Sequence, residues 1–310
     1  MIPKSDDIRF ELTTLCNYDC IICPREQLRR PKTVMSTPMF SRLLDAVLAG
    51  TDQYRLLTFA GLGEPMLDPD FLDKVRVGRE AGLEVLLLTN GSRLTEENFR
   101  RMDELGVQSV RVSFYGMTNA SYAAVHRPPD AAAFDQMRET LERIAAMPRR
   151  TKLLMTFNVV PGVNEADLAA WLSHWEPRVD LVEAWRPHNW VYGRALRPVS
   201  AVLRSTCGRP FTGPLQIQAD GTVNMCCFDF NGDLTLGDLN STSLAGIFDQ
   251  EPFLKLARCH RSGDFAGAGF ICERCDQRNV EKDGVMVYNS QFDIAERVEM
   301  TSTGYAKLAD

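Results

Sequence analysis

Three cysteines near the start of the chain have the spacing of a metal-cluster loop. Cys16, Cys20 and Cys23 form the pattern CxxxCxxC, directly after an apolar run at residues 8–12 that predicts a strand. Three thiolates on one short loop can hold three irons of a cubane iron–sulfur cluster, and the fourth iron stays open to bind a small molecule. The spacing therefore predicts a reactive cluster rather than a sealed one.

A structural zinc knuckle and a redox-active cysteine pair are the alternatives for this loop. Zinc loops generally arrange their ligands as two matched pairs with two-residue gaps, which completes a tetrahedron. Here a three-residue gap precedes a two-residue gap, and no fourth ligand lies nearby in the sequence. The spacing favours the iron–sulfur cluster over zinc.

The cysteine loop and a later segment, Gly61-Leu62-Gly63-Glu64-Pro65, resemble the radical S-adenosylmethionine (SAM) superfamily over most of the chain. In that family the open iron binds the amino and carboxylate groups of SAM, and one electron from the cluster cleaves the sulfonium to give a 5′-deoxyadenosyl radical. The resemblance implies SAM as cofactor and an external one-electron donor of the flavodoxin or ferredoxin type. Ile21 stands where many members carry an aromatic residue, yet it still offers an apolar backbone position for contact with adenine.

The same resemblance assigns SAM contacts to the ends of successive strands. Glycines let the backbone approach a ligand closely, although a plain strand-to-helix turn ending at Pro65 is the alternative for the glycine-rich segment. The polar side chains at the ends of the fourth and fifth strands could instead hydrogen-bond neighbouring backbone. The residues expected to bind SAM are Ile21, Gly61, Gly63, Glu64, Asn90, Ser113 and Asn158.

Strand-like and helix-like segments alternate through the first two-thirds of the chain. The expected strands cover residues 8–12, 54–59, 84–88, 109–114, 152–160 and 179–185, and the expected helices, from apolar residues at helical spacing, cover 39–48, 70–81, 96–105, 133–147 and 165–175. Such alternation predicts an α/β fold with a parallel sheet and right-handed crossovers. The working site should lie at the carboxyl ends of the strands. By resemblance, the fold is a partial (β/α)6 barrel, similar to a TIM barrel, with an open side for substrate.

From about residue 199 the helical periodicity fades and six more cysteines appear. The dipeptide Asp220-Gly221 predicts a hairpin turn shortly before two of them. This region resembles the Twitch form of the SPASM/Twitch auxiliary domain, which implies a second [4Fe-4S] cluster, whereas the alternative is a four-cysteine zinc ribbon. The expected ligands are Cys207, Cys226, Cys272 and Cys275.

The sequence does not decide whether the fourth ligand is Cys226, Cys227 or Cys259. We prefer Cys226 for its spacing after Gly221. The expected boundaries are a radical SAM barrel at 1–198, an auxiliary domain at 199–285 and a tail at 286–310.

Two cysteines are left over once both clusters have their ligands, and they bear on the reaction. A spare cysteine is usually a small buried hydrophobe, but a thiol can also return a hydrogen atom to a carbon radical. With such a donor, hydrogen abstraction from a carbinol leads to an epimer, as in the epimerase of the neomycin pathway. Without it, a base takes the proton, the auxiliary cluster takes the electron and the product is a ketone, as in the dehydrogenase of the butirosin pathway. The spare thiols favour epimerisation with Cys259 as the hydrogen donor, and dehydrogenation is the alternative.

Aromatic and polar side chains after the fourth and sixth strands are the candidates for substrate contact, because such loops meet at the mouth of the barrel. The alternative for the two tryptophans of residues 183–194 is that they pack the joint between domains. The expected contacts are Tyr115, Arg127, Glu183, His188, Trp190 and Arg194. The implied substrate is a small polar molecule of the aminoglycoside or aminosugar kind, as in antibiotic biosynthesis.

A peptide-modifying maturase is a third possibility. Such enzymes usually carry an additional N-terminal module, and here the cluster loop begins within sixteen residues of the start.

Composition limits the function classes. The chain has 310 residues, 45% of them hydrophobic, which is enough for the core of one large domain or two modest ones. Its formal net charge of -6 argues against a nucleic-acid binder. Neither a secretory pattern nor a run of about 18 apolar residues is present, so we expect a cytoplasmic protein without a membrane partner. Nine cysteines in that compartment indicate metal binding or catalysis rather than disulfides.

Overall fold

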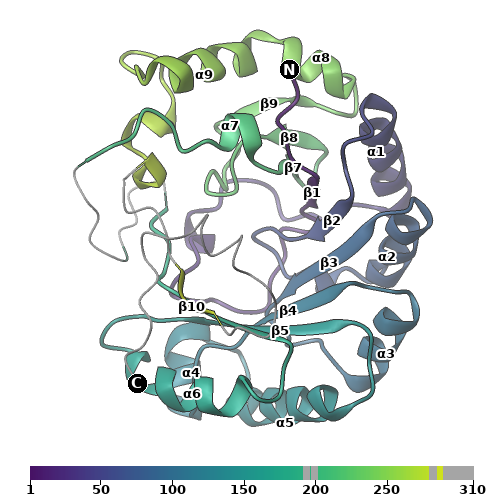
Figure 1. Ribbon diagram of the computed structural model, residues 1–310, viewed down its shortest axis with the longest axis vertical. Coiled ribbons are helices and arrows are strands. Elements are labelled where there is room, and N and C mark those ends of the chain that lie inside the picture. Colours follow the sequence, from purple (N-terminus) through teal and green to yellow (C-terminus); the bar gives the residue numbers. More distant parts are fainter. Residues whose placement is uncertain (191–195, 197–201, 279–284, 289–310) are drawn as a thin grey trace.

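The computed structural model describes residues 1–190, 196, 202–278 and 285–288. Within these residues, ten strands form one sheet in the order β10-β6-β5-β4-β3-β2-β1-β7-β8-β9. Figure 1 shows that the sheet curves like an arch and that α1, α2, α3 and α5 cover its convex side.

Six parallel strands form the centre of the sheet. They are β1 (Asp7–Phe10), β2 (Leu56–Phe59), β3 (Glu84–Thr89), β4 (Ser109–Ser113), β5 (Lys152–Asn158) and β6 (Leu181–Trp185). Each pairs in parallel with the next along the chain. The crossovers contain α1 (Thr37–Gly50), α2 (Phe71–Glu80), α3 (Glu96–Glu104), α4 (Asn119–His126), α5 (Ala133–Ala146) and α6 (Leu168–Trp175). This arrangement confirms the predicted α/β fold and the partial barrel.

Local sequence signals explain where several helices begin and end. The Ser36 side chain accepts a hydrogen bond from the Met39 amide at the start of α1, and Thr95 forms a capping box with Asn98 before α3. Gly82 and Gly106, predicted as helix stops, have φ angles of 82° and 76°, a left-handed conformation that glycine adopts without strain. Helix α4 (Asn119–His126) was not predicted from the sequence, and β2 begins two residues later than the predicted strand 54–59.

The core lies between the sheet and its helices. Strand β5 is buried along nearly its whole length, as expected for a parallel strand covered on both faces. Phe10 meets Phe40 with ring centroids 4.8 Å apart, and Phe114 meets Trp175 at 5.6 Å. This packing holds the carboxyl ends of the strands in a fixed row. None of the described helices is long and apolar enough to cross a membrane.

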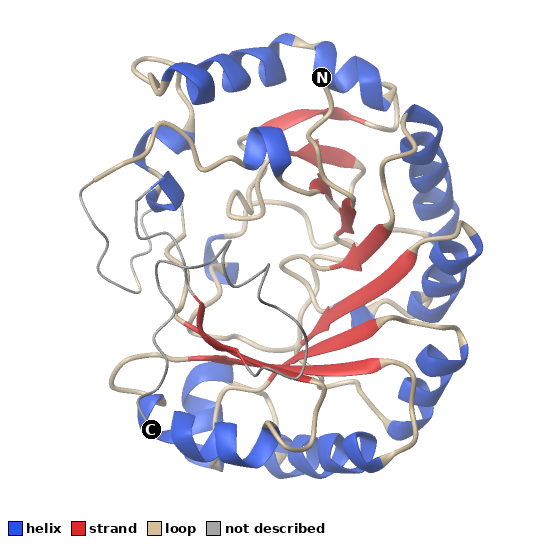
Figure 2. Cartoon of the chain, in the orientation of Figure 1, coloured by secondary structure: helices blue, strands red, loops and turns tan. Residues whose placement is uncertain are grey.

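The C-terminal region extends the same sheet. Strand β7 (Leu215–Ile217) pairs in parallel with β1, and β8 (Thr222–Asn224) and β9 (Thr235–Asp238) follow as antiparallel neighbours. The predicted hairpin turn is confirmed, with Gly221 at φ 89°. Figure 2 shows this continuous run of strands, with α8 (Leu244–Asp249) and α9 (Glu251–Ser262) beside its β9 end. The auxiliary region is therefore built onto the barrel sheet.

The predicted boundaries of the domains stay predictions. Residue 198 and residue 199 lie outside the described part, as does most of the expected tail at 286–310. Strand β10 (Val285–Tyr288) spans the expected boundary at 285 and pairs antiparallel with β6.

Candidate active site

The structure brings the three N-terminal cysteines together on the loop after β1. The Cys23 amide donates to the Cys20 carbonyl oxygen at 3.0 Å, which closes a tight turn between the two thiols. Burial, and then the neighbouring Cys23 and Cys16, raises the pKa of the Cys20 thiol, so bound metal must supply the charge that keeps it a thiolate. Among the described residues, no three His, Cys, Asp or Glu side chains converge tightly enough to hold one metal ion. A cubane cluster instead takes each thiolate on a separate iron, so this donor set fits a cluster.

Asn90 holds one side of the cysteine loop. Its amide nitrogen donates to the Asn17 side-chain oxygen at 3.1 Å and lies 3.6 Å from the Cys16 sulfur. The Asn17 amide in turn donates to the Ser92 hydroxyl at 2.8 Å. The side-chain nitrogen of Asn90, predicted as a SAM contact, thus contacts the loop that carries the cluster ligands.

Glu64 joins the glycine-rich segment to the end of β3. Its carboxylate accepts hydrogen bonds from the Thr89 hydroxyl at 2.7 Å, the backbone amide of Asn90 at 2.7 Å and the backbone amide of Met66 at 3.0 Å. Burial raises the pKa of Glu64, and these three hydrogen bonds oppose that rise. The carboxylate therefore ties the glycine-rich segment to the end of β3, and three chain donors leave it little capacity for a ligand.

Close approach between loops explains both glycines of this segment. A Cβ at Gly63 would overlap the carbonyl oxygen of Thr13, and a Cβ at Gly61 would overlap the Glu11 side chain. The Glu64 amide also donates to the Leu15 carbonyl at 2.7 Å. The glycines let this segment lie directly against the cysteine loop.

The ends of β4 and β5 supply polar groups that suit a bound cofactor. The side-chain oxygen of Asn158 is buried and has no hydrogen-bond partner among the described residues. A buried acceptor without a partner is costly, and a hydroxyl of a ligand such as SAM would satisfy it. Ser113 ends β4 in the neighbouring strand, and Ile21 packs against Tyr115, Val125 and Val160. These residues fit the predicted SAM site.

A cavity of about 650 Å³ lies beside the glycine-rich segment, a volume typical of small-molecule sites. Gly61 and Leu62 line it on one side, and residues of the hairpin region line it on the other. His188 and Trp190 line the cavity as predicted. The Trp190 indole also donates to the Ile22 carbonyl at 2.8 Å, which ties this wall to the cysteine loop.

Three of the other predicted substrate contacts, Tyr115, Arg127 and Glu183, do not line this cavity. Glu183 instead positions two residues that do, because its carboxylate pairs with Arg111 at 2.8 Å and accepts from the Trp185 indole at 3.0 Å. Tyr115 packs beside the cysteine loop, and Arg127 lies at the surface, 3.9 Å from Asp19. Arg194 lies outside the described residues.

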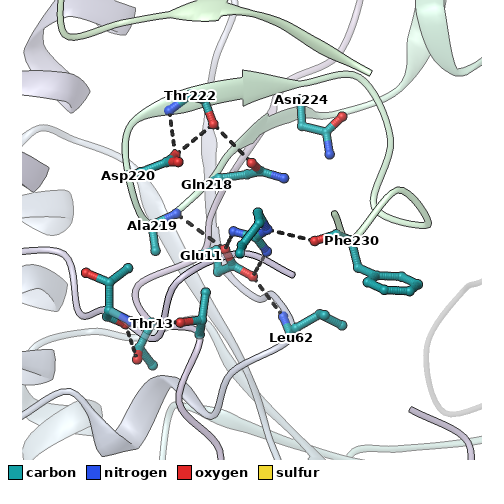
Figure 3. A network of polar contacts seen from close by, with 12 residues as sticks. Glu11, Thr13, Leu62, Gln218, Ala219, Asp220, Thr222, Asn224 and Phe230 are labelled. Atoms are coloured by element: carbon teal, nitrogen blue, oxygen red, sulfur yellow. Dashed lines mark hydrogen bonds and ion pairs between the residues drawn. The ribbon is translucent and has the colours of Figure 1, made fainter. Parts of the chain in front are cut away.

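An ion pair that the sequence analysis missed joins the walls of the cavity. Glu11 accepts two hydrogen bonds from Arg30, at 2.6 and 2.9 Å; the Glu11 side chain is buried and that of Arg30 is largely covered. Figure 3 shows Glu11 between Leu62, whose amide donates at 3.1 Å, and Ala219, whose amide donates at 3.3 Å. The Arg30 guanidinium also donates to the Phe230 carbonyl at 2.7 Å. The pair therefore connects β1, the glycine-rich segment, the region after the cysteine loop and the hairpin.

The four predicted auxiliary ligands line one small second cavity, namely Cys207, Cys226, Cys272 and Cys275. Burial raises the pKa of Cys272 and of Cys275 to about 12, so both thiols need a metal to become thiolates. Cys227 lines the large cavity instead, and Cys259 lies on α9 and lines neither. This placement fits Cys226 as the fourth ligand of a second cluster.

Arg209 stands between the two cavities and lines both. Its guanidinium lies over the Phe228 ring at 4.9 Å and makes no ion pair with a carboxylate of the described residues. Nearby thiolate charge, first that of Cys227 and then that of Cys226, raises the pKa of Arg209. The arginine therefore places a positive charge beside the auxiliary cysteines.

Family models match both regions of the chain. The radical SAM superfamily model matches residues 10–174, which is more than half of the chain, and the iron–sulfur cluster-binding SPASM domain matches residues 207–276. A curated relative similar over nearly the whole chain is the S-adenosyl-L-methionine-dependent 2-deoxy-scyllo-inosamine dehydrogenase of Niallia circulans, 20% identical over 89% of this chain and 94% of that protein. The AdoMet-dependent heme synthase of Methanosarcina barkeri is 34% identical over 35% of this chain, and the match spans only 31% of that longer protein.

Solved structures show the same fold. The crystal structure of BtrN in complex with AdoMet and 2-DOIA has a TM-score of 0.63 at 19% identity, over 91% of this chain and 96% of that one. Native anSMEcpe with bound AdoMet and Cp18Cys peptide has a TM-score of 0.62 at 13% identity, over 90% and 89% of the two chains. Together with the cysteine loop and the auxiliary thiols, these matches show that the chain belongs to the radical SAM superfamily, carries a SPASM iron–sulfur domain, and uses SAM, iron–sulfur clusters and a reductant.

Proposed function

We propose that the protein is a radical SAM dehydrogenase that oxidises a secondary alcohol of a small polar molecule to a ketone. The main observation in its support is that the large cavity and the cavity of the auxiliary cysteines share one wall. Cys207, Arg209, Cys226 and Gln277 line both the large cavity and the cavity of the four auxiliary cysteines. Because Gly61 and Leu62 line the same large cavity, a substrate there would touch the SAM side and the auxiliary side at once.

When bound, SAM and its cluster would supply a radical that takes a hydrogen atom from the carbinol carbon, and a second [4Fe-4S] cluster would accept the remaining electron. The chain must then receive the hydroxyl proton. His188 lines the cavity and is the side chain there whose ordinary pKa is closest to neutral, so we assign it that role. The hydrogen atom, the proton and the electron together account for the oxidation of the alcohol to a ketone.

The walls of the cavity suit a polyhydroxylated ring. Trp190 and Phe228 meet edge to face at 5.7 Å and form an apolar side, whereas Glu11, Arg111 and Gln216 supply polar groups. The relative from Niallia circulans is named for 2-deoxy-scyllo-inosamine, a ring of this kind, and it resembles this chain over nearly its whole length. That likeness supports dehydrogenation of an aminocyclitol or aminosugar over the epimerisation that the sequence analysis favoured.

Epimerisation is the second candidate, and Cys227 is the observation that favours it. Its thiol lies on the wall of the large cavity, where it could return a hydrogen atom to a substrate radical. Cys259, the donor predicted from the sequence, does not line that cavity. The donor in this second candidate is therefore Cys227.

One experiment separates the two reactions. The reduced protein is incubated without oxygen with SAM and 2-deoxy-scyllo-inosamine in deuterated buffer, and the products are analysed by mass spectrometry and NMR. Dehydrogenation predicts a ketone two mass units lighter than the substrate, with no deuterium in recovered substrate and full activity in Cys227→Ala. An inverted carbon that carries deuterium, lost in Cys227→Ala, would reject dehydrogenation in favour of epimerisation.

A further inference from the structure

His126 is a fully buried histidine beside the cysteine loop, and both of its ring nitrogens have partners. It is the last residue of α4, and none of its surface is exposed. Its Nδ1 atom lies 3.5 Å from the sulfur of Cys20. Its Nε2 atom accepts a hydrogen bond from the backbone amide of Tyr115 at 3.1 Å.

The Tyr115 contact determines where the ring carries its proton. A backbone N–H can only donate, so Nε2 must present a lone pair and cannot be protonated. The proton of the neutral ring then has to be on Nδ1, which faces the Cys20 sulfur. A ligating cysteine is a thiolate and accepts such a hydrogen bond.

Aromatic rings hold the imidazole in this orientation. The Tyr115 ring stacks on it with centroids 4.5 Å apart, and the Tyr122 ring packs against it at 4.3 Å. The hydroxyl of Tyr122 donates to that of Tyr18, which lies on the cysteine loop itself. A ring flip would exchange both nitrogens for carbons and lose both hydrogen bonds, so the packing and the hydrogen bonds select the same orientation.

The end of α4 is also attached to the loop through the backbone. The Ile21 amide donates to the Val125 carbonyl at 2.9 Å, one residue on either side of the Cys20 and His126 pair. This backbone hydrogen bond, next to the Cys20 and His126 pair in both segments, helps to set the distance between the imidazole and the sulfur. No carboxylate makes an ion pair with His126 among the described residues, so nothing there draws its Nδ1 proton away from Cys20.

We infer that His126 is a positioning residue that donates an Nδ1–H···S hydrogen bond to Cys20 and so makes the first cluster easier to reduce. A hydrogen bond to a ligand sulfur stabilises the extra negative charge of a reduced cluster, and such bonds are among the factors that set cluster potentials. The inference concerns the reduction that must precede SAM cleavage. It rests on the family of the chain and is independent of the proposed substrate and product.

Two amide variants, which differ by one methylene, separate the hydrogen bond from the packing. In His126→Asn the amide nitrogen can take the place of Nδ1 and keep the donor to Cys20. In His126→Gln the amide oxygen can take the place of Nε2 and keep the acceptor for Tyr115, but the donor to sulfur is lost. Each variant is loaded with iron and sulfide and titrated electrochemically. Electron paramagnetic resonance follows the reduced first cluster, which is identified by the change that SAM causes in its spectrum.

We expect the ratio of reduced to oxidised first cluster at a fixed solution potential to fall about tenfold in His126→Gln, the scale of one hydrogen bond to a charged group. The ratio in His126→Asn should stay close to that of the wild type. Equal ratios in the wild type and His126→Gln would overturn the inference. An equal fall in both variants would also overturn it, because packing would then explain the effect.

A measurement on the unmodified protein covers the case in which a variant fails to fold. With ¹⁵N-labelled histidine, pulsed electron paramagnetic resonance of the SAM-sensitive cluster should detect a nitrogen coupling through the hydrogen bond. A His174→Gln control, which replaces a histidine that pairs with Glu142 on α5, should keep the coupling. Absence of any histidine coupling in the wild type would overturn the inference.

Discussion

Replacing Glu11 with alanine should lower the free energy of unfolding by about 3–5 kcal/mol, the usual cost of removing one partner of a buried ion pair. The structure gives the reason. The side chains of Glu11 and Arg30 are 7% and 11% exposed, and the variant would leave the Arg30 guanidinium buried without its carboxylate. The amides of Leu62 and Ala219 would lose the same acceptor.

A double variant tests the reasoning more sharply. In Glu11→Ala with Arg30→Met, neither charge is left unpaired, so stability should recover in part relative to Glu11→Ala alone. Glu139→Ala is the matched control, because Glu139 pairs with Arg143 on the exposed face of α5. Its loss should stay within about 0.5 kcal/mol.

Anaerobic urea unfolding, followed by circular dichroism on the cluster-loaded protein, measures these three variants and the single variant Arg30→Met. The slopes of the transitions must agree before the free energies are compared. A loss below about 1 kcal/mol in Glu11→Ala would refute the view that this pair joins the glycine-rich segment to the hairpin. The same conclusion would follow if the double variant lost the sum of the two single effects.

Three further predictions concern the clusters and the cofactor. Cys226→Ser should reduce iron from about eight to about four per chain, whereas Cys227→Ser and Cys259→Ser should keep about eight; the reverse result for Cys226 and Cys227 would reassign the ligand. Asn158→Leu should raise the Kd for SAM about tenfold, because the buried oxygen loses a ligand hydrogen bond, and an unchanged Kd from calorimetry would exclude this contact. Arg209→Met should make the midpoint potential of the auxiliary cluster more negative, since a nearby positive charge favours the reduced form; a potentiometric titration with no shift would contradict this.

Features encoded by contiguous residues were predictable from the sequence. The cysteine loop, the six parallel strands and the hairpin turn at Asp220-Gly221 each depend on local spacing or on residue-specific backbone preferences, and the structure places them as expected. Helix α4 was missed although Thr118 and Ser121 form a capping box at its start. Its small and polar residues give only a weak apolar stripe, so periodicity alone could not identify it.

Features that depend on long-range packing were not predictable. Glu11 and Arg30 are nineteen residues apart, and the partners that make their pair important come from the hairpin about two hundred residues later. The sequence favoured Cys259 over Cys227 as the hydrogen donor, and only the packed structure shows that Cys227 lines the large cavity while Cys259 does not. The position of Tyr115 at the end of a strand was predictable. The stacking of its ring on His126 beside the cysteine loop was not.

The most direct test is the fate of SAM in the presence of the reduced, oxygen-protected protein. The arrangement of Cys16, Cys20 and Cys23 predicts that the cofactor is cleaved to 5′-deoxyadenosine and methionine, and that alanine at any of the three cysteines abolishes this cleavage. Intact SAM after incubation with protein that contains its full complement of iron and sulfide would contradict the account.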